Sequence, residues 1–350
     1  RSWGLVAEGT TFTNYFQSGQ VLFGKRRAYQ RKVAVADFDG VCSGDIYVLE
    51  PKNPAVLLPK LLPFICQTEG FYEHAVGTSA GSLSPRTNWN QLAKYEFPLP
   101  PLDEQRRIAK VLLSLSKTDE LLQETIHAND GVENAYLKEI FGLYGDDFSR
   151  WNKVELREIA YIQSGVAKGR KPDQEKTVDM QYITVSNVQD GRLDLSNIKR
   201  LTVEKNKVEQ YRLLFGDVLM TEGGDPDKLG RGTVWQDELP GCIHQNHIFA
   251  VRPNPKILDS WFLAAVARSP YGKQFFLSRS KATSNLATIN KKQVGSFLIP
   301  IPNLKKQKEI VKNWQSIRRM STRTGARKEN LQEIQSMVLN SLLGGSNEYF

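Results

Sequence analysis

One proline-rich motif occurs twice in the sequence, and this repeat constrains the fold more than any other feature. The first copy spans residues 97–108 (FPLPPLDEQRRI) and the second spans residues 299–310 (IPIPNLKKQKEI). Five residues of the first copy recur 202 positions later, namely Pro98, Pro100, Leu102, Gln105 and Ile108. A chain of 350 residues is expected to form two domains. The repeat further predicts that these two domains resemble each other.

The repeat extends into the segments that precede the motif. Residues 45–51 (DIYVLEP) match residues 247–253 (HIFAVRP) at the same spacing, whereas residues 19–22 match residues 216–219 at a spacing of 197. Alternating apolar residues predict strands, and apolar residues at helical spacing predict short helices. The sequence therefore predicts mixed modules of helix and sheet. The predicted strands are 33–36, 45–49, 182–185, 217–220 and 247–251, and the predicted helices are 57–68 and 260–268.

The first copy is shorter than the second at its front. The second copy opens at Trp151 and reaches Gly216 after 65 positions, whereas only 18 residues precede the matching Gly19. By comparison of the copies, we expect that roughly fifty residues are missing from the front of the first module.

Each proline motif is followed by a long segment with an apolar heptad repeat. The same register holds in both copies at the spacing of 202, which is typical of two long helices that pair. A helix of about 40 residues would be roughly 60 Å long, so it would extend beyond a module of about 150 residues. Packing of each helix on its own module alone is therefore the less favoured alternative. The predicted coiled-coil residues are Ile108, Leu115, Leu122, Ile310, Ile317, Leu331 and Val338.

The two predicted helices have opposite net charge. Residues 103–144 contain eight acidic and five basic residues, whereas residues 303–343 contain three acidic and nine basic residues. Opposite charges favour pairing of the two helices with each other over pairing of each with a copy of itself.

The composition favours an acidic partner for the chain. The net charge is +9 with a pI near 9.3, which favours a polyanion such as nucleic acid. No apolar run approaches the ~18 residues that a membrane helix requires, and the first residues do not read as a secretory signal. The three cysteines cannot all pair, so we expect a reducing, cytoplasmic environment.

Motifs for catalysis are largely absent from the sequence. It lacks a phosphate-binding G-x-x-x-x-G-K-[ST] loop and the Asn/Asp-Pro-Pro-aromatic motif of adenine methyltransferases. A metal-dependent nuclease that uses Asp225, Asp227 and Lys228 stays open as an alternative, although such compact runs are typical of solvated turns. Cys242, His244 and His247 provide at most three zinc ligands, so we predict no metal site.

Basic and small polar loops are the positive signal for function. Residues 24–32 combine five cations with a tyrosine, and guanidinium groups bind phosphates or guanine edges. Residues 78–88 and 280–290 are hydroxyl-rich loops at matching places in the two copies. The predicted DNA-binding residues are Lys25, Arg26, Arg27, Tyr29, Arg31, Ser82, Ser84, Arg86, Asn88, Lys168, Arg170, Lys171, Lys228, Arg231, His244, Gln245, Asn246, Arg279, Lys281, Ser284, Asn285 and Asn290.

Two variable modules, each followed by this proline motif and a long helix, resemble the DNA-specificity subunit of type I restriction–modification enzymes. Residues 98–108 and the opening of the second module at residues 151–159 carry the resemblance, which covers nearly the whole chain. It implies a mixed α+β fold with two globular target-recognition domains, two long antiparallel helices in a coiled coil, and a pseudo-twofold internal repeat. The implied domains are residues 1–102 (first target-recognition domain), 103–144 (first helix), 145–302 (second target-recognition domain), 303–343 (second helix) and 344–350 (tail).

The resemblance also implies a non-catalytic role in a larger complex. Each module would bind one half of a bipartite site in double-stranded DNA, and the helices would set the distance between the halves. Two methyltransferase subunits and a restriction subunit would assemble on the chain and would hold S-adenosylmethionine, ATP and magnesium. A type II-like enzyme with the same two-module plan stays open as an alternative, and its partners would distinguish it.

Overall fold

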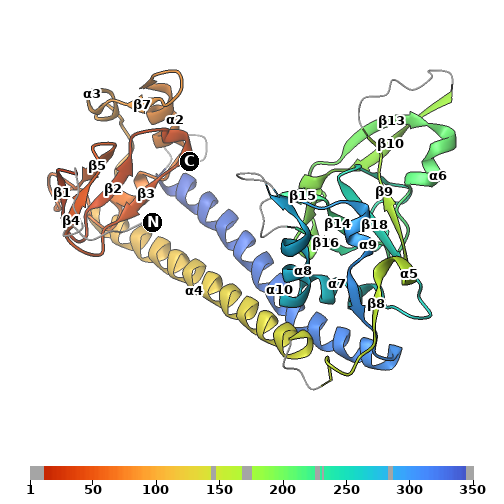
Figure 1. Ribbon diagram of the computed structural model, residues 1–350. Helices are drawn as coiled ribbons and strands as arrows, with labels where there is room; N and C mark the ends of the chain where they lie inside the picture. Colours follow the sequence, from red (N-terminus) through yellow and green to blue (C-terminus); the bar gives the residue numbers. More distant parts are fainter. Residues whose placement is uncertain are drawn as a thin grey trace. The chain divides into compact units, whose positions relative to one another are not determined.

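The computed structural model describes residues 12–142, 147–167, 176–224, 229–230, 232–282 and 287–343 (Figure 1). The chain divides into two compact units. The first unit contains Arg1–Ile126 and Arg323–Phe350, and the second contains His127–Thr322. Each long helix therefore contributes one part to each unit.

The first unit contains short strands and helices, followed by the first long helix. Its elements are β1 (Asn14–Phe16), β2 (Val21–Gly24), η2 (Ala28–Gln30), β3 (Val33–Val35), β4 (Gly40–Cys42), β5 (Ile46–Leu49), α1 (Leu62–Ile65), α2 (Glu69–Gly77), β6 (Ser79–Ala80), β7 (Arg86–Thr87), α3 (Trp89–Leu92) and the start of α4 (Leu102–Phe141).

The second unit has more strands. Its first elements are β8 (Lys153–Glu155), α5 (Leu156–Ile159), β9 (Ala160–Ser164), β10 (Thr177–Ile183), η4 (Val185–Asn187), β11 (Val188–Gln189), β12 (Arg192–Leu193), β13 (Lys199–Glu204), η5 (Lys205–Lys207) and α6 (Val208–Tyr211). The later elements are β14 (Val218–Thr221), β15 (Gly223–Gly224), β16 (Gly232–Val234), β17 (Ile243–His244), β18 (Ile248–Pro253), α7 (Ser260–Arg268), α8 (Pro270–Arg279), β19 (Lys281–Ala282), β20 (Ala287–Thr288), α9 (Lys291–Gly295), β21 (Leu298–Pro300) and the start of α10 (Leu304–Leu343).

The same antiparallel three-strand frame occurs in both units. The order is β3-β2-β5 in the first unit and β16-β14-β18 in the second, where β9 adds a fourth strand. The registers also agree, because Val21 pairs with Val35 and Leu49, and Val218 pairs with Val234 and Val251. The internal repeat seen in the sequence is thus a repeat of structure.

A glycine precedes the central strand of each frame. Gly19 and Gly216 have φ values of +88° and +89°, which favour glycine over residues with a side chain. Their backbone N–H groups donate to Ala36 and Trp235 at 2.8 and 2.9 Å, respectively. This shared turn explains the match between residues 19–22 and 216–219.

Most predicted strands are confirmed, and two predictions need correction. The predicted strand 182–185 ends at Ile183, because Thr184 and Asn187 form a capping box around η4. The predicted helix 57–68 is reduced to Leu62–Ile65, where Pro63 occupies the first turn and fixes the backbone there. The predicted helix 260–268 is α7, capped by the Asp259 carboxylate.

The repeated glutamine of the proline motif connects each long helix to its module. Gln105 is buried; its side-chain amide donates to Val56 and Pro100 at 2.8 Å, and its oxygen accepts from Leu58 at 2.8 Å. Gln307 makes the same three bonds in the second unit, to Ile257, Pro302 and Asp259, each at 2.9 Å. The motif therefore has a structural role, which is to fix the start of each helix.

In the first unit, the start of α4 runs antiparallel to the end of α10. Ile108 and Leu112 pack with Leu339 and Leu343 in one apolar cluster that also includes residues of α1. Lys328 forms an ion pair of 2.8 Å with Asp119, one of two ion pairs that join the helices among the described residues.

The second unit contains the other antiparallel helix segments, and here the contact is charged. The Glu133 carboxylate is buried and accepts from the Trp314 indole at 2.7 Å and from Arg268 of α7 at 2.6 and 3.1 Å. Arg318 of α10 lies 3.9 Å from the same carboxylate. Asp190, between β11 and β12, is the second ion-pair partner of Arg268.

The predicted coiled-coil residues lie on the buried sides of these helices. Ile108 and Ile310 are 4% and 1% exposed, and the other predicted positions are half-buried, namely Leu115, Leu122, Ile317, Leu331 and Val338. The predicted class, a mixed helix-and-sheet fold with two long antiparallel helices, is confirmed.

Candidate nucleic-acid interface

The basic segment of the first unit connects β2 to β3. It turns through η2, and the two residues that flank η2, Arg27 and Arg31, have positive φ values of 55° and 51°. Such conformations are uncommon for residues with a side chain and occur often at functional sites. The side chains of Arg26, Tyr29 and Arg31 are exposed, and those of Lys25 and Arg27 are half-buried.

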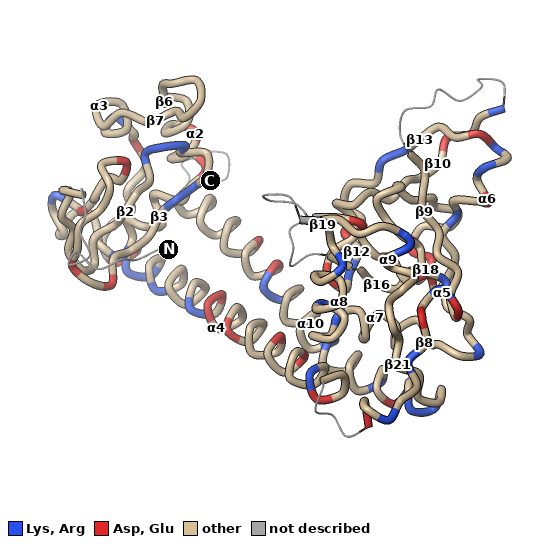
Figure 2. Tube along the Cα trace, viewed as in Figure 1, with Lys and Arg blue, Asp and Glu red and all other residues tan. Residues whose placement is uncertain are grey.

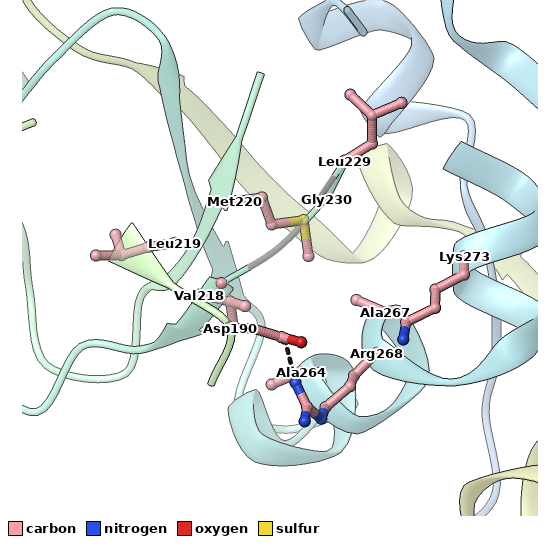
Figure 3. A pocket seen from close by; sticks show the side chains of 11 residues that line it. Asp190, Val218, Leu219, Met220, Leu229, Gly230, Ala264, Ala267, Arg268 and Lys273 are labelled. Atoms are coloured by element: carbon pink, nitrogen blue, oxygen red, sulfur yellow. Dashed lines mark ion pairs between the residues drawn. The ribbon is translucent and has the colours of Figure 1, made fainter. Parts of the chain in front are cut away.

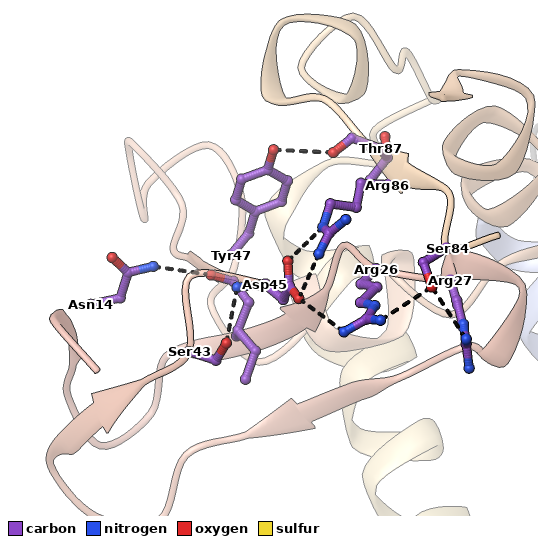
Figure 4. Close-up of polar contacts among 10 residues, drawn as sticks. Asn14, Arg26, Arg27, Ser43, Asp45, Tyr47, Ser84, Arg86 and Thr87 are labelled. Atoms are coloured by element: carbon purple, nitrogen blue, oxygen red, sulfur yellow. Dashed lines mark hydrogen bonds and ion pairs between the residues drawn. The ribbon is translucent and has the colours of Figure 1, made fainter. Parts of the chain in front are cut away.

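Three arginines, two from the segment between β2 and β3 and one from β7, meet around one carboxylate and one hydroxyl (Figure 4). Asp45 accepts from Arg86 at 2.8 and 3.3 Å, and Arg26 lies 3.7 Å from the same carboxylate. The Ser84 hydroxyl accepts from Arg26 at 3.1 Å and from Arg27 at 3.2 Å. The hydrogen bond from Arg86 holds the pKa of Asp45 below its usual value, so this carboxylate stays ionised.

Arg31 and Lys25 have other partners within the module. Arg31 pairs with Glu69 and lies over the ring of Tyr72 at 4.9 Å. The same pair lowers the pKa of Glu69 through the hydrogen bond from Arg31. Lys25 lies 4.9 Å from the centre of the Tyr47 ring. Both cations therefore help to fix the segment between β2 and β3. In contrast, the side chains of Arg26 and Arg86 remain about half exposed.

The hydroxyl-rich loop of the first unit projects between β6 and β7. Ser82 is exposed, and Leu83 beside it is 90% exposed. Asn88 has a structural explanation, because its side chain accepts from Asn90 and caps α3. Asn290 caps α9 in the same way in the second unit.

The second unit requires one clear correction. His244 was predicted to contact DNA, but it is 0% exposed within β17, and its Nδ1 lies 3.1 Å from the Tyr211 carbonyl. Burial lowers the pKa of His244 to about 4, so the ring is neutral at physiological pH. Both residues of β17, Ile243 and His244, are buried. The polar residue types at positions 244–247 do not reveal this burial.

The neighbours of His244 lie closer to the surface. Gln245 and Asn246 are half-buried, and the Gln245 side chain accepts from Val185 at 3.2 Å. Arg279 is exposed at the end of α8, 5.9 Å from the centre of the Phe275 ring. His247 is exposed and pairs with Glu222.

Part of the predicted interface cannot be placed. Lys281 is described only as a backbone residue of β19. The remaining predicted residues lie outside the described parts of the chain, as do Asp225 and Asp227 of the nuclease alternative: Lys168, Arg170, Lys171, Lys228, Arg231, Ser284 and Asn285.

A pocket beside the buried ion pair of the second unit is too small for a cofactor. Arg268, Asp190 and Lys273 line it together with apolar residues of β14 (Figure 3). Its volume is about 20 Å³, which is close to the space for a single water molecule. Across the described residues, no group of three or more His, Cys, Asp or Glu side chains is arranged to hold a metal ion.

Sequence reasoning missed Asp45 and Glu222 as parts of the candidate interface. Asp45 lies among arginines and Glu222 pairs with His247, and a search for cations does not identify acidic residues. Asp45 stands directly before β5, at the start of the repeated segment 45–51, and this position was the available signal. Figure 2 marks the acidic and basic residues of each unit.

The family model for the type I restriction modification DNA specificity domain matches residues 3–128 and 149–333. The chain belongs to this family. The two matched stretches each contain one module frame and the glutamine-anchored start of its helix. Membership confirms the resemblance that was drawn from the proline motif and the module opening.

Two similar proteins are named as specificity subunits of type I restriction enzymes. The specificity subunit of the type I restriction enzyme MjaVIII of Methanocaldococcus jannaschii is 24% identical over 87% of this chain and 74% of its own length. A second relative from that organism, named for the enzyme MjaX, is 24% identical over 45% of this chain. That match spans only 38% of the relative's own length.

The fold is similar to that of a solved S subunit of a type I restriction–modification system from M. genitalium. The TM-score is 0.57 at 16% identity, over 95% of this chain and 84% of the other. In the described parts of the chain, no helix is long and apolar enough to cross a membrane.

Proposed function

We propose that this chain is the DNA-recognition subunit of a type I restriction–modification complex and reads a bipartite site in double-stranded DNA. One module, within residues 1–102, would contact one half-site, and the other, within residues 145–302, would contact the second. The paired segments 103–144 and 303–343 would set the distance between the half-sites.

The observation that carries this proposal is one frame built twice with different surface residues. The strand registers, the turn glycines and the buried glutamines agree between the units. At the exposed edge of this frame, the first unit has Arg26 and Arg86, and the second has Gly223 and Thr288. Similar frames with different faces suit two half-sites of different sequence.

The charge of the first module supports contact with DNA. Arginines bind phosphates and contact guanine edges through two parallel hydrogen bonds. Arg26 and Arg86 are each 48% exposed, so part of each guanidinium can contact DNA. In the second module, the described candidates with at least partial exposure are Gln245, Asn246, Arg279 and Asn290, of which Asn290 also caps α9.

The helices would act as the spacer of the complex. Each has 40 residues, which corresponds to a length of about 60 Å. One turn of duplex DNA is about 34–36 Å long, so helices of this length can support contacts to half-sites one turn apart.

Catalysis would belong to the partners, and this chain would be non-catalytic. Two methyltransferase subunits would bind S-adenosylmethionine, flip the target adenine and methylate it, and a restriction subunit would use ATP and magnesium. DNA of a prokaryotic host and its invaders is cytoplasmic, which places the complex there. The family match does not favour a type II-like enzyme with the same plan. The family match does not favour a nuclease built on Asp225, Asp227 and Lys228.

Selection of DNA by the assembled complex tests this proposal. The chain is purified with its methyltransferase subunits, and bound sequences are selected from a random duplex library. We expect a motif of two different specified halves separated by unspecified positions of fixed number. A single contiguous motif, or no enrichment at physiological salt, would contradict the proposal. Cleavage by the isolated chain with magnesium would favour the nuclease instead.

A further inference from the structure

The two modules have equivalent residues at one edge of the repeated frame. The backbone N–H of Lys25 donates to the Asp45 carbonyl at 3.0 Å, directly after β2. In the second module, the N–H of Glu222 donates to the His247 carbonyl at 2.9 Å, directly after β14. Asp45 and His247 are also 202 positions apart, so the sequence repeat and the hydrogen bonds give the same equivalence.

The side chains at this shared place differ in chemistry. In the first module, a lysine follows the central strand and an aspartate precedes β5. In the second module, a glutamate and a histidine take these places, and they pair with each other. The backbone at this edge is thus the same in the two modules, whereas the side chains there differ.

Asp45 fixes the exposed arginines of its module. Its carboxylate binds the Nε and Nη2 atoms of Arg86 and lies beside Arg26, while Ser84 holds Arg26 from the other side. Arg86 keeps Nη1 free of these bonds, so one edge of its guanidinium stays available for a ligand. Figure 4 shows the carboxylate between the two guanidinium groups.

Stability of the fold does not explain this arrangement. Exposed ion pairs contribute little to folding, because the pair is solvated and two long side chains lose freedom. The loss of freedom is useful in recognition, where a side chain that is already oriented loses less entropy when it binds. An acidic group within a basic face also lowers affinity for DNA of any sequence.

We propose that Asp45 is a positioning residue that orients Arg86 and Arg26 for the half-site of the first module. His247 and Glu222 take the equivalent place and determine preference for the other half-site. This inference rests on the proposed function and names residues that determine specificity within it.

The experiment compares variants of the full chain in complex with its methyltransferase subunits. Affinity is measured for the selected bipartite duplex and for duplexes in which one half or both halves are scrambled. For Asp45→Ala, we expect preference for the first module's half-site to fall about tenfold. Preference for the other half stays unchanged, and affinity for fully scrambled DNA is unchanged or higher, because a negative charge has been removed.

Two further variants make the experiment specific. His247→Ala should reduce preference for the opposite half-site only. Glu96→Ala removes one acidic charge from an exposed position of the first module and should leave both preferences unchanged. Thermal unfolding of each complex checks that the variants fold.

The possible outcomes distinguish failure of this inference from failure of the proposed function. If the unaltered complex shows no preference for either half, the proposed function fails. If it shows the preference and Asp45→Ala retains it fully, the positioning role is wrong. An equal loss at both half-sites would show a general structural effect and would also overturn the inference.

Discussion

At the scale of single residues, two buried glutamines connect the long helices to their modules. Gln105 and Gln307 are 1% and 0% exposed, and each satisfies two backbone carbonyls and one backbone N–H. No apolar residue of similar size can replace these bonds, and buried backbone groups without partners are costly. The glutamine of the motif therefore has a physical explanation that is independent of DNA.

We expect Gln105→Ala and Gln307→Ala each to destabilise the affected module by about 1–3 kcal/mol, because buried polar groups lose their partners. Chemical denaturation combined with hydrogen exchange measures the loss and locates it. Gln91→Ala, at an exposed glutamine of the first module, is the matched control and should change stability by less than about 0.5 kcal/mol. Equal stability of all three variants would contradict this role.

Residue-level prediction from the sequence succeeded where the repeat supplied a comparison. The repeat identified Gln105, Gln307, Gly19 and Gly216, although it did not reveal what the glutamines bind. The repeat could not show that His244 is buried, because a histidine within a polar run can be either buried or exposed. The repeat marked the position of Asp45 but did not reveal its role, since the contact to Arg86 joins positions 41 residues apart.

At the scale of elements, the two helix contacts use different chemistry at equivalent positions. In the second unit, Glu133 binds Trp314, Arg318 and Arg268. The residues at the corresponding places in the first unit are neutral, namely Gln335, Leu112, Ser116 and Cys66. Gln335 donates to Ser116 at 3.2 Å, where the second unit has the pair of Glu133 and Arg318. Cys66 is buried, and burial raises its pKa to about 12, so it is an unreactive thiol.

The heptad repeat predicted the helices and their apolar face. It did not predict that one helix contact is charged and the other neutral. Opposite net charges predicted that the two helices pair with each other, and two ion pairs join them among the described residues. Most charged residues face solvent, where pairing contributes little. The charge that matters most is the buried one, and net charge does not identify it.

We expect Glu133→Gln to destabilise the second unit by about 3–5 kcal/mol, because Arg268 and Arg318 lose a buried counterion. Hydrogen exchange along residues 127–141 should accelerate, and exchange along residues 102–126 should change little. Glu139→Gln, at an exposed position in the same part of α4, is the control. If the two variants have the same exchange, the network does not stabilise the contact.

At the scale of the whole molecule, the duplication separates two tasks. The parts that agree between the copies are the strand frame, the turn glycine and the anchored helix, which together form a scaffold. Among the parts that differ are the exposed side chains at the edge of that frame. Variation at such positions can change the DNA sequence that is read without changing how the partners assemble, which is the division expected for a specificity subunit.

The most direct test of this account is a methylation profile of the genome of a host that carries the chain and its methyltransferase partners. Methylated adenines should lie in one motif with two different specified halves and a gap of constant length, and they should disappear when the chain is removed. A contiguous motif, or methylation that persists without the chain, would contradict the claim that two modules read two half-sites.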